Sequence, residues 1–363
     1  MIYFVKKRRI YILAISVFIA SFSIVSYFVF FYGCKPQIIS VKMHHVQNDV
    51  QDFPEIEKKQ NIIENECEKK ESDGIVVSND IVEGSEIVVE KEKEKYKPFK
   101  FAIIGDSERE KSPYGFGENA YGVFDHVKTL YPDFVLFTGD IIMANADSRG
   151  PRVSIRHVRK VFDKYFANIP YYIVFGYHDV ECGVTCVDLW QEYFSDHKYI
   201  ADKKRVLHYS FDYENTHFVI LSTDWPTKRT IKAEQLSWLE KDLEKNKLKN
   251  VIVATHVPPV TFYKKSAKNC HDFACQPELQ RKLQYIFKNG GVDLVISGHE
   301  AVFDHKIVDG IHYILSGNTL GGKAKYKGVK SGQTFSEVLI NGSSIIVRGI
   351  DMEDGLLREI KVR

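Results

Sequence analysis

Five short polar segments of this 363-residue chain each follow a strand-like apolar run. The runs are rich in β-branched and aromatic residues, which suits strands buried on both faces of a sheet, and they span 99–104, 134–137, 171–175, 251–254 and 293–296. The polar residues that follow them are Asp106, Asp140, His178 with Asp179, His256 and His299. Groups at successive strand ends share one rim of a sheet. Carboxylates and imidazoles gathered there predict a site for a divalent cation such as Mn, Fe or Zn.

Composition limits the classes of protein to which the chain can belong. It is 44% hydrophobic and 13% aromatic, enough to bury one large core. Its formal net charge of +2 argues against a surface that binds polyanions. We therefore expect no nucleic-acid partner.

The first 33 residues differ from the rest. Residues 10–33 carry no charge and follow the basic cluster at 6–9. As a helix this stretch is long enough to cross a hydrocarbon core of about 30 Å. We expect 1–9 to be a cytoplasmic tail, 10–33 a transmembrane signal anchor, and the rest periplasmic or extracellular, because basic flanks stay in the cytoplasm. A cleaved signal peptide is the alternative, although the run exceeds the usual apolar region of about 7–15 residues.

Residues 34–97 form a charged segment rich in Glu, Lys, Asn, Ser and Asp. Mixed charge with few aromatic residues is typical of a solvated linker, so we expect this segment to be largely flexible. Two short apolar pieces, 74–78 and 85–90, leave open a hairpin within it.

Residues 98–363 alternate strand-like runs with amphipathic segments. Apolar residues recur three or four positions apart, which is helical spacing, in 119–131, 153–166, 233–245 and 277–287. The runs at 205–213 and 216–224 are expected to pair as antiparallel strands. This order predicts an α/β fold of two sheets flanked by helices.

The motifs GD, GD, G-x-HD, THxPP and GHE, in that order, resemble those of the calcineurin-like metallophosphoesterases. The opening GDS and the segments YSFDY, HFVILSTD and EQLSWLEKDL are similar to the purple-acid-phosphatase-related branch of that superfamily. The resemblance covers nearly all of 99–350. It implies a four-layer αββα sandwich and hydrolysis of a phosphate ester with one or two divalent metal ions.

The resemblance also assigns roles to the strand-end residues. Asp106 would ligate the first metal, Asp140 would bridge both metals, and His256 and His299 would ligate the second. His178, with Asp179 beside it, would be the histidine–acid pair next to the phosphate, where imidazole orients the ester or protonates its leaving group.

Several family ligand positions carry other residues. Glu108 stands where the first motif often has histidine, a mild change because the related branch often lacks that histidine. Met143 replaces a ligating tyrosine, Tyr177 an asparagine, and Ala301 a second histidine. A thioether suits a hard cation poorly, and alanine offers no ligand atom.

The ligands that remain predict a reduced site. The first pocket keeps Asp106 and the shared Asp140, whereas the second keeps three protein ligands, the usual minimum for a catalytic zinc-like site. We expect one metal, or weak loading of the first pocket. Possible substitute ligands are Tyr177, Glu300 and His305. The alternative is a catalytically inactive descendant that binds a ligand or a partner protein.

Four cysteines follow two of the motif strands: Cys182, Cys186, Cys270 and Cys275. Outside the cytoplasm such cysteines form disulfides, so we expect bridges among these four. Their spacing leaves the pairing open. A zinc cluster is less favoured, because C-x3-C and C-x4-C are not the tight spacing of a zinc knuckle.

Overall fold

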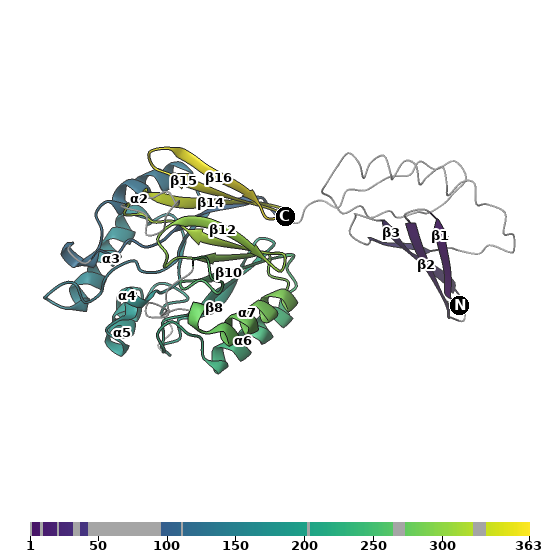
Figure 1. Ribbon diagram of the computed structural model, residues 1–363, viewed down its shortest axis with the longest axis horizontal. Coiled ribbons are helices and arrows are strands. Elements are labelled where there is room, and N and C mark those ends of the chain that lie inside the picture. Colours follow the sequence, from purple (N-terminus) through teal and green to yellow (C-terminus); the bar gives the residue numbers. More distant parts are fainter. Residues whose placement is uncertain are drawn as a thin grey trace. The chain divides into compact units, whose positions relative to one another are not determined.

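The computed structural model describes residues 96–109, 112–201, 204–263, 273–321 and 332–363, together with the backbone of 2–7, 10–19, 22–31 and 37–42. The chain divides into two compact units, Met1–Lys95 and Tyr96–Arg363 (Figure 1).

The described part of the first unit is a four-stranded antiparallel sheet in the order β1-β2-β3-β4. Its strands are β1 (Ile2–Lys7), β2 (Ile10–Ile19), β3 (Phe22–Phe31) and β4 (Gln37–Lys42). The structure thus has strands where a single helix was predicted for 10–33. The segment is rich in Ile, Val, Phe and Tyr, which favour strands, and an apolar run alone does not separate helix from strand. Within the described residues, no helix combines the length and apolarity needed to cross a bilayer.

The linker predicted for 34–97 lies almost wholly outside the described residues. Only β4 and residues 96–97 belong to the described part, and the hairpin considered for 74–78 and 85–90 does not.

The second unit contains two six-stranded sheets. One has the order β16-β15-β14-β5-β6-β7 and the other β12-β13-β11-β10-β9-β8. The first sheet comprises β5 (Phe99–Ile104), β6 (Phe134–Phe137), β7 (Tyr171–Ile173), β14 (Thr334–Asn341), β15 (Ser344–Asp351) and β16 (Gly355–Lys361). The second comprises β8 (Tyr209–Tyr213), β9 (Thr216–Leu221), β10 (Asn250–Thr255), β11 (Leu294–Ser297), β12 (Phe303–Val308) and β13 (Ile311–Ser316).

Each sheet has a parallel centre. Strands β5, β6 and β7 are parallel, as are β9, β10, β11 and β13. The remaining strands pair antiparallel at the sides, and the predicted antiparallel pairing of β8 with β9 is confirmed. The parallel strands of each sheet therefore end at one edge, as the motif pattern required.

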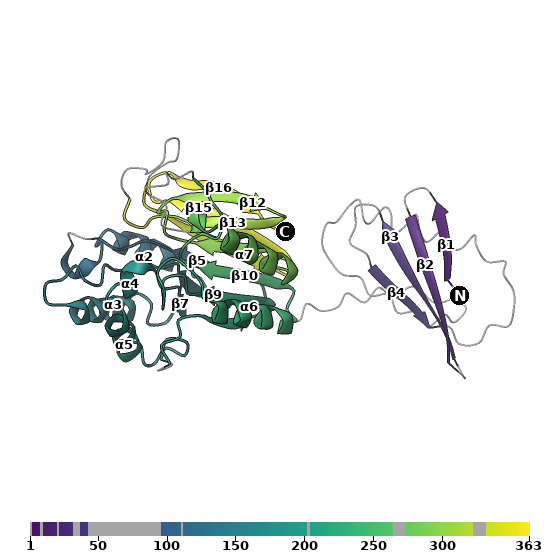
Figure 2. The ribbon, with the colours of Figure 1, turned by 60° about the horizontal axis from the view of Figure 1, so that its bottom comes forward.

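Helices cover the outer face of each sheet (Figures 1 and 2). The helices are α2 (Ala120–Thr129), α3 (Pro151–Tyr165), α4 (Tyr177–Val180), α5 (Val184–Tyr193), α6 (Ala233–Lys245) and α7 (Pro277–Asn289), with short 3-10 turns η1 (Pro113–Gly115) and η3 (Phe273–Cys275). Helices α2, α3 and α5 share one apolar core with the β5–β7 sheet, and α6 and α7 share another with the β9–β11 sheet. The predicted mixed α/β fold with two sheets is confirmed.

The alternation of side chains along each strand explains this layering. On β9, Phe218 and Ile220 lie in the core that joins the two sheets, whereas Val219 and Leu221 pack with α6 and α7. Because successive strand residues point to opposite faces, a strand covered on both sides must be apolar throughout. Burial on both faces therefore explains why the strand segments are continuous apolar runs in the sequence.

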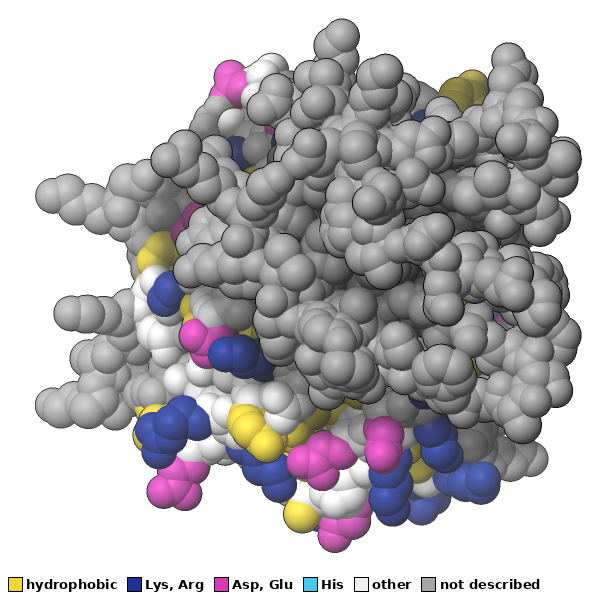
Figure 3. Space-filling view, turned by 90° about the vertical axis from the view of Figure 1, so that its right-hand side faces the viewer, with side chains coloured by type: hydrophobic (Ala, Val, Ile, Leu, Met, Phe, Trp, Pro, Cys, Tyr) yellow, Lys and Arg dark blue, Asp and Glu magenta, His cyan; other side chains and the backbone are white. Residues whose placement is uncertain are grey.

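The surface shown in Figure 3 carries charges of both signs. Where described side chains are visible, Lys and Arg lie interspersed with Asp and Glu rather than in one basic patch. This mixture agrees with the net charge of +2 for the chain.

A mostly buried histidine, His217, links β8, β9 and α6. The Nδ1 of His217 lies 2.6 Å from Asp212, and its Nε2 lies 3.0 Å from Asp242. Burial lowers the pKa of His217, but the hydrogen-bonded carboxylates of Asp242 and Asp212 raise it, and the net direction is upward. A raised folded-state pKa stabilises the fold fully below the unfolded value of about 6.5. This stability is lost as pH rises through the folded pKa.

We therefore expect the urea midpoint of the wild-type protein to fall between about pH 6 and about pH 9. His217→Leu removes the titrating group, so its midpoint should change less over the same interval. Equilibrium unfolding of both proteins at the two pH values measures the difference. Equal pH dependence in the two proteins would show that His217 does not carry the effect.

Candidate functional site

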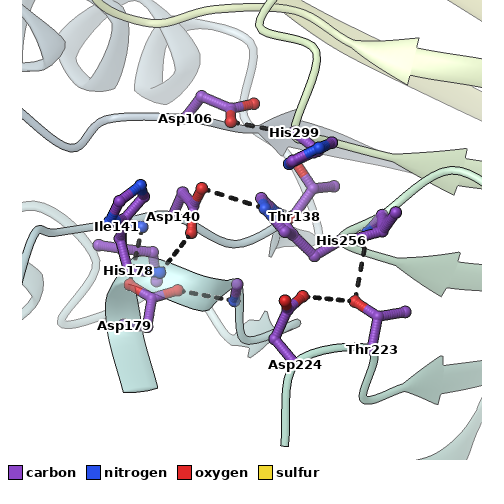
Figure 4. Close-up of polar contacts among 12 residues, drawn as sticks. Asp106, Thr138, Asp140, Ile141, His178, Asp179, Thr223, Asp224, His256 and His299 are labelled. Atoms are coloured by element: carbon purple, nitrogen blue, oxygen red, sulfur yellow. Dashed lines mark hydrogen bonds and ion pairs between the residues drawn. The ribbon is translucent and has the colours of Figure 1, made fainter. Parts of the chain in front are cut away.

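The strand-end residues of both sheets converge on one site (Figure 4). Asp106 follows β5, Asp140 follows β6, and His178 and Asp179 lie in α4 directly after β7. His256 and His299 follow β10 and β11 of the other sheet. The carboxyl ends of two parallel strand sets therefore supply the site, a common position for ligands in α/β folds.

The backbone at the site is unusual. Asp106, Asp140 and His299 have φ values of 48°, 48° and 70°. Non-glycine residues rarely adopt this left-handed region, and such conformations concentrate at functional sites. The glycines before these motifs permit close approach: a Cβ on Gly139 would meet Gly176 N and His256 Nδ1 at 2.7 Å each, and one on Gly176 would overlap the Asp140 carboxylate.

Three of the predicted ligands form a compact group. Asp140, His256 and His299 each offer one ligand atom, and these atoms all lie within 4.8 Å of one another. Asp140 and His256 are buried, and the rings of His256 and His299 lie 5.2 Å apart. This arrangement brings together the three residues that the sequence assigned to the second metal pocket.

The hydrogen bonds of His256 prepare its other nitrogen for a cation. Nδ1 lies 2.8 Å from the carbonyl oxygen of Thr138, which can only accept, so Nδ1 carries a proton. Nε2 is buried without a hydrogen-bond partner, 3.1 Å from Oδ2 of Asp140. In the neutral ring two acceptor atoms face each other, and either a proton or a cation relieves their repulsion. A histidine whose second nitrogen is held by a carbonyl is the usual form of a metal ligand, so these residues fit a divalent cation.

The pKa values of this pair shift in opposite directions. Burial would lower the pKa of His256, but the Asp140 carboxylate raises it well above its ordinary value. Burial would raise the pKa of Asp140, yet the charge of the nearby His256 lowers it, helped by the charge and the backbone N–H of His178. The lowered pKa of Asp140 favours its negative form, which binds a cation, whereas the raised pKa of His256 favours a proton on Nε2 that a cation has to displace.

Asp106 is buried beside this group. Its Oδ1 accepts a hydrogen bond of 3.2 Å from the backbone N–H of His299, so the first motif fixes the loop of the fifth (Figure 4). This contact ties the two sheets together at the site.

The partner of His178 differs from the predicted one. Asp179 turns its carboxylate to the backbone: Oδ1 accepts from the N–H groups of Ile141 and Ile142, and Oδ2 accepts from that of Gly176. Its role in the structure is to position the loops after β6 and β7. Burial and the nearby Asp140 carboxylate raise its pKa to about 7.

The carboxylate that contacts His178 is Glu181, one turn further along the chain. Oε2 of Glu181 lies 3.2 Å from Nδ1 of His178, and the backbone N–H of His178 donates to Oδ1 of Asp140 at 2.9 Å. Burial would lower the pKa of His178, but Glu181 and Asp140 raise it. Sequence reasoning missed Glu181; its i,i+3 spacing from His178 was the available signal.

Glu108 is a second missed residue. With Asp140 and His178 it forms another group whose ligand atoms lie within 4.8 Å of one another. Burial raises the pKa of Glu108 well above its ordinary value, and the carboxylates of Asp140 and Asp106 raise it further. The sequence signal was its place in the first motif, at the position where the family often has a histidine.

The predicted substitute ligands have other surroundings. The ring of Tyr177 lies under Nζ of Lys228, 3.3 Å from its centroid. Nε2 of His305, on β12, lies 3.1 Å from Nδ1 of His312. Glu300 is buried, and none of the three belongs to the two ligand groups found among the described residues.

Two loops are held by other contacts near the site. Cys182, in the turn after α4, forms a disulfide with Cys186 in the first turn of α5. Cys275 is also disulfide-bonded, whereas Cys270 lies outside the described residues. The sulfurs of Cys182, Cys186 and Cys275 are therefore not thiolate ligands in this structure.

The loop after β9 supports His256. The hydroxyl of Thr223 accepts from the N–H of Val257 at 3.3 Å and donates to Asp224 at 2.7 Å (Figure 4). Burial raises the pKa of Asp224, and the nearby His256 opposes that shift.

Comparisons with known proteins found similar sequences and similar folds. It is 27% identical over 172 residues to YvnB, an uncharacterized protein of Bacillus subtilis strain 168; the match covers 44% of this chain and 12% of YvnB. The chain thus spans only a small part of that relative. Its fold is similar to that of PhoD, with 11% identity, a TM-score of 0.54, and coverage of 93% of this chain and 74% of PhoD. A likeness was also found to GAP50 of Plasmodium, described as the anchor in the inner membrane complex, at 17% identity, a TM-score of 0.49, and coverage of 73% and 88%.

A family match carries more weight than these individual likenesses. Residues 99–303, more than half of the chain, match the family described as calcineurin-like phosphoesterase. The matched range includes all five motif strands and every residue of the site described above. The chain belongs to the calcineurin-like phosphoesterase family.

Proposed function

We propose that this protein is a metal-dependent phosphoric ester hydrolase, similar to the purple-acid-phosphatase-related branch and acting outside the cytoplasm. One observation carries the proposal: a cation-ligand group, Asp140 with His256 and His299, lies directly against His178, whose backbone N–H donates to Asp140 and whose Nδ1 contacts Glu181. Asp140 connects the cation-ligand group to His178, because its Oδ1 accepts from the backbone N–H of His178 and its Oδ2 faces His256.

Asp140, His256 and His299 would hold a divalent cation, with Asp106 beside them. When bound, such a cation polarises a phosphoryl oxygen and makes a water molecule more acidic. The histidine nitrogens favour Zn, Fe or Mn over Mg. The chain's own contribution is to fix these ligands through Thr138, which sets the proton position on His256, and through the buried loop glycines.

His178 would protonate the leaving group of the ester. Glu181 lies at its Nδ1, so Nδ1–H donates to the carboxylate and Nε2 remains for the substrate. With both nitrogens protonated, Nε2–H can donate its proton to the departing oxygen of the ester. Asp179 acts as a positioning residue, because its carboxylate holds the backbone of the adjacent loops.

The location follows from two features. The disulfide between Cys182 and Cys186 favours a compartment that is not reducing. The uncharged segment 10–33, preceded by the basic residues 6–9, supports a membrane anchor with the N-terminus in the cytoplasm.

A reporter that is active only outside the cytoplasm should therefore be active when it is fused after Arg363. The full chain should stay with the membrane fraction after a high-salt wash, because an apolar anchor does not depend on screened charges. Replacing the basic cluster at 6–9 with neutral residues is the matched control for orientation. A soluble chain with a cytoplasmic reporter would contradict the anchor.

A second candidate function is binding without catalysis. Tyr177 and Ala301 stand at two family ligand positions, and the Tyr177 ring lies beneath Lys228. Such a protein would bind a phosphorylated ligand without turning it over. Hydrolysis of an aryl phosphate monoester and a diester by the full chain separates the two functions: turnover that a chelator abolishes supports the hydrolase, and metal binding without turnover supports the binding protein.

A further inference from the structure

The loop between β9 and α6 carries two adjacent cations, Lys228 and Arg229, next to the site. Nζ of Lys228 lies 3.3 Å from the centroid of the Tyr177 ring, and Cζ of Arg229 lies 5.8 Å from it. The same ring lies 5.1 Å from the ring of His178, the proposed proton donor. Tyr177 therefore connects the two cations to the imidazole, and positive charge lies on the His178 side of the site.

The two cations have no carboxylate partner in the described part of the chain. Neither Lys228 nor Arg229 forms an ion pair there, and Nε of Arg229 is buried without a hydrogen-bond partner. The nearby carboxylate of Asp224 accepts from the backbone N–H of Arg229 at 3.2 Å and from the hydroxyl of Thr223, not from the guanidinium. A buried donor without an acceptor costs free energy, so an anion bound here would satisfy it.

Backbone contacts hold this loop in place. Arg229 has a φ of 53°, a conformation that non-glycine residues rarely adopt and that is common at functional sites. Its carbonyl oxygen accepts from Nε2 of Gln276 at 2.7 Å, and the N–H of Thr230 donates to the carbonyl oxygen of Thr223 at 2.8 Å. The cations are therefore preorganised, which lowers the entropy cost of binding an anion.

We propose that Lys228 and Arg229 recognise a second anionic group on the leaving-group side of the substrate, with Tyr177 as a positioning residue for the Lys228 ammonium. The inference rests on the proposed function and names its substrate class: a phosphate ester whose leaving group itself carries a carboxylate or a phosphate. The guanidinium suits planar, bidentate contact with such a group, and the ammonium supplies a point charge. The face of the Tyr177 ring orients that ammonium through a cation–π contact.

Ligand binding to the Zn-loaded full chain tests this inference without an activity assay. The probes are alkylphosphonates of increasing chain length that end in a carboxylate, each compared with the matching carboxamide by calorimetry. Their carbon–phosphorus bonds are not hydrolysed, and the two members of a pair differ in charge alone. The wild type should bind the best carboxylate about tenfold more tightly than its carboxamide, and added salt should reduce this preference.

Variants identify the residues that carry the preference. Lys228→Gln and Arg229→Gln together should abolish the preference while leaving affinity for the carboxamide within about twofold, because the phosphonate itself still binds at the metal. Lys241→Gln removes the same charge from an exposed position on α6 and should bind like the wild type. Tyr177→Phe keeps the ring and should keep the preference, whereas Tyr177→Leu should reduce it. A merely structural tyrosine would change the affinity for both ligands alike.

The possible failures are distinguishable. Equal affinity for carboxylate and carboxamide throughout the series overturns this inference alone, as does a preference that survives the double change at Lys228 and Arg229. A wild type that takes up no Zn, or that binds no phosphonate once loaded, overturns the proposed function and this inference with it.

Discussion

Replacing Asp140 should remove bound metal and lower phosphoesterase activity by about a hundredfold or more. Mutating a residue that only supports a metal ligand already lowers metal affinity or activity about 10- to 100-fold. Asp140 is itself a candidate ligand and belongs to both ligand groups, so we expect a larger loss. Asp140→Asn keeps the shape of the side chain but removes its charge, so loss of metal in this variant reports ligation rather than packing. Metal content per chain and kcat/KM with an aryl phosphate measure the two effects.

The control for this variant is Asp125→Asn. Asp125 lies on α2 with an exposed side chain that pairs only with Lys128, at 3.8 Å, among the described contacts. It should match the wild type in metal content, activity and thermal unfolding. Asp140→Asn with full metal content and near-normal turnover would contradict the assignment of Asp140 as a ligand.

Replacing His178 should separate catalysis from metal binding. His178→Asn cannot transfer a proton, so kcat should fall about a hundredfold to ten-thousandfold, the range of general acid catalysis. Bound metal at Asp140, His256 and His299 should stay at the wild-type level, because His178 does not belong to that ligand group.

The choice of substrate makes the His178 experiment specific. An aryl phosphate with an acidic phenol needs little help to depart, whereas an alkyl phosphate needs a proton. The defect of His178→Asn should therefore be much smaller with the activated aryl ester. Glu181→Gln, which keeps a hydrogen-bonding group at Nδ1, should show a milder form of the same pattern. An equal defect with both leaving groups would show that His178 does not supply the proton.

The sequence was sufficient to predict much of the fold. Strands β5 and β6 begin and end where the apolar runs begin and end, because strands buried on both faces leave an uninterrupted apolar signal. Helix α6 likewise occupies the predicted range 233–245. The single turn α4 has four residues, too few for a periodic pattern, and was not predicted.

Other features depend on contacts that no local pattern records. The direction of the Asp179 carboxylate is set by backbone N–H groups in the loops after β6 and β7, and the backbone carbonyl oxygen of Asp179 accepts from Trp190, eleven residues later. The ring of Tyr177 packs against Lys228, which lies in the loop after β9 of the second sheet. Glu108 gains its place from the Asp140 backbone. Sequence motifs identify which residues lie at the strand ends that form the site. Tertiary contacts determine which side-chain atoms of these residues contact one another.

The central claim is a cation held by Asp140, His256 and His299 that supports phosphate-ester hydrolysis. The most direct test is the metal content of the purified full chain, measured together with hydrolysis of an aryl phosphate before chelation, after chelation and after stepwise return of Zn, Fe or Mn. The account predicts that activity rises in proportion to the first equivalent of metal bound per chain. A protein that takes up no metal, or that hydrolyses the ester equally well without it, would contradict the account.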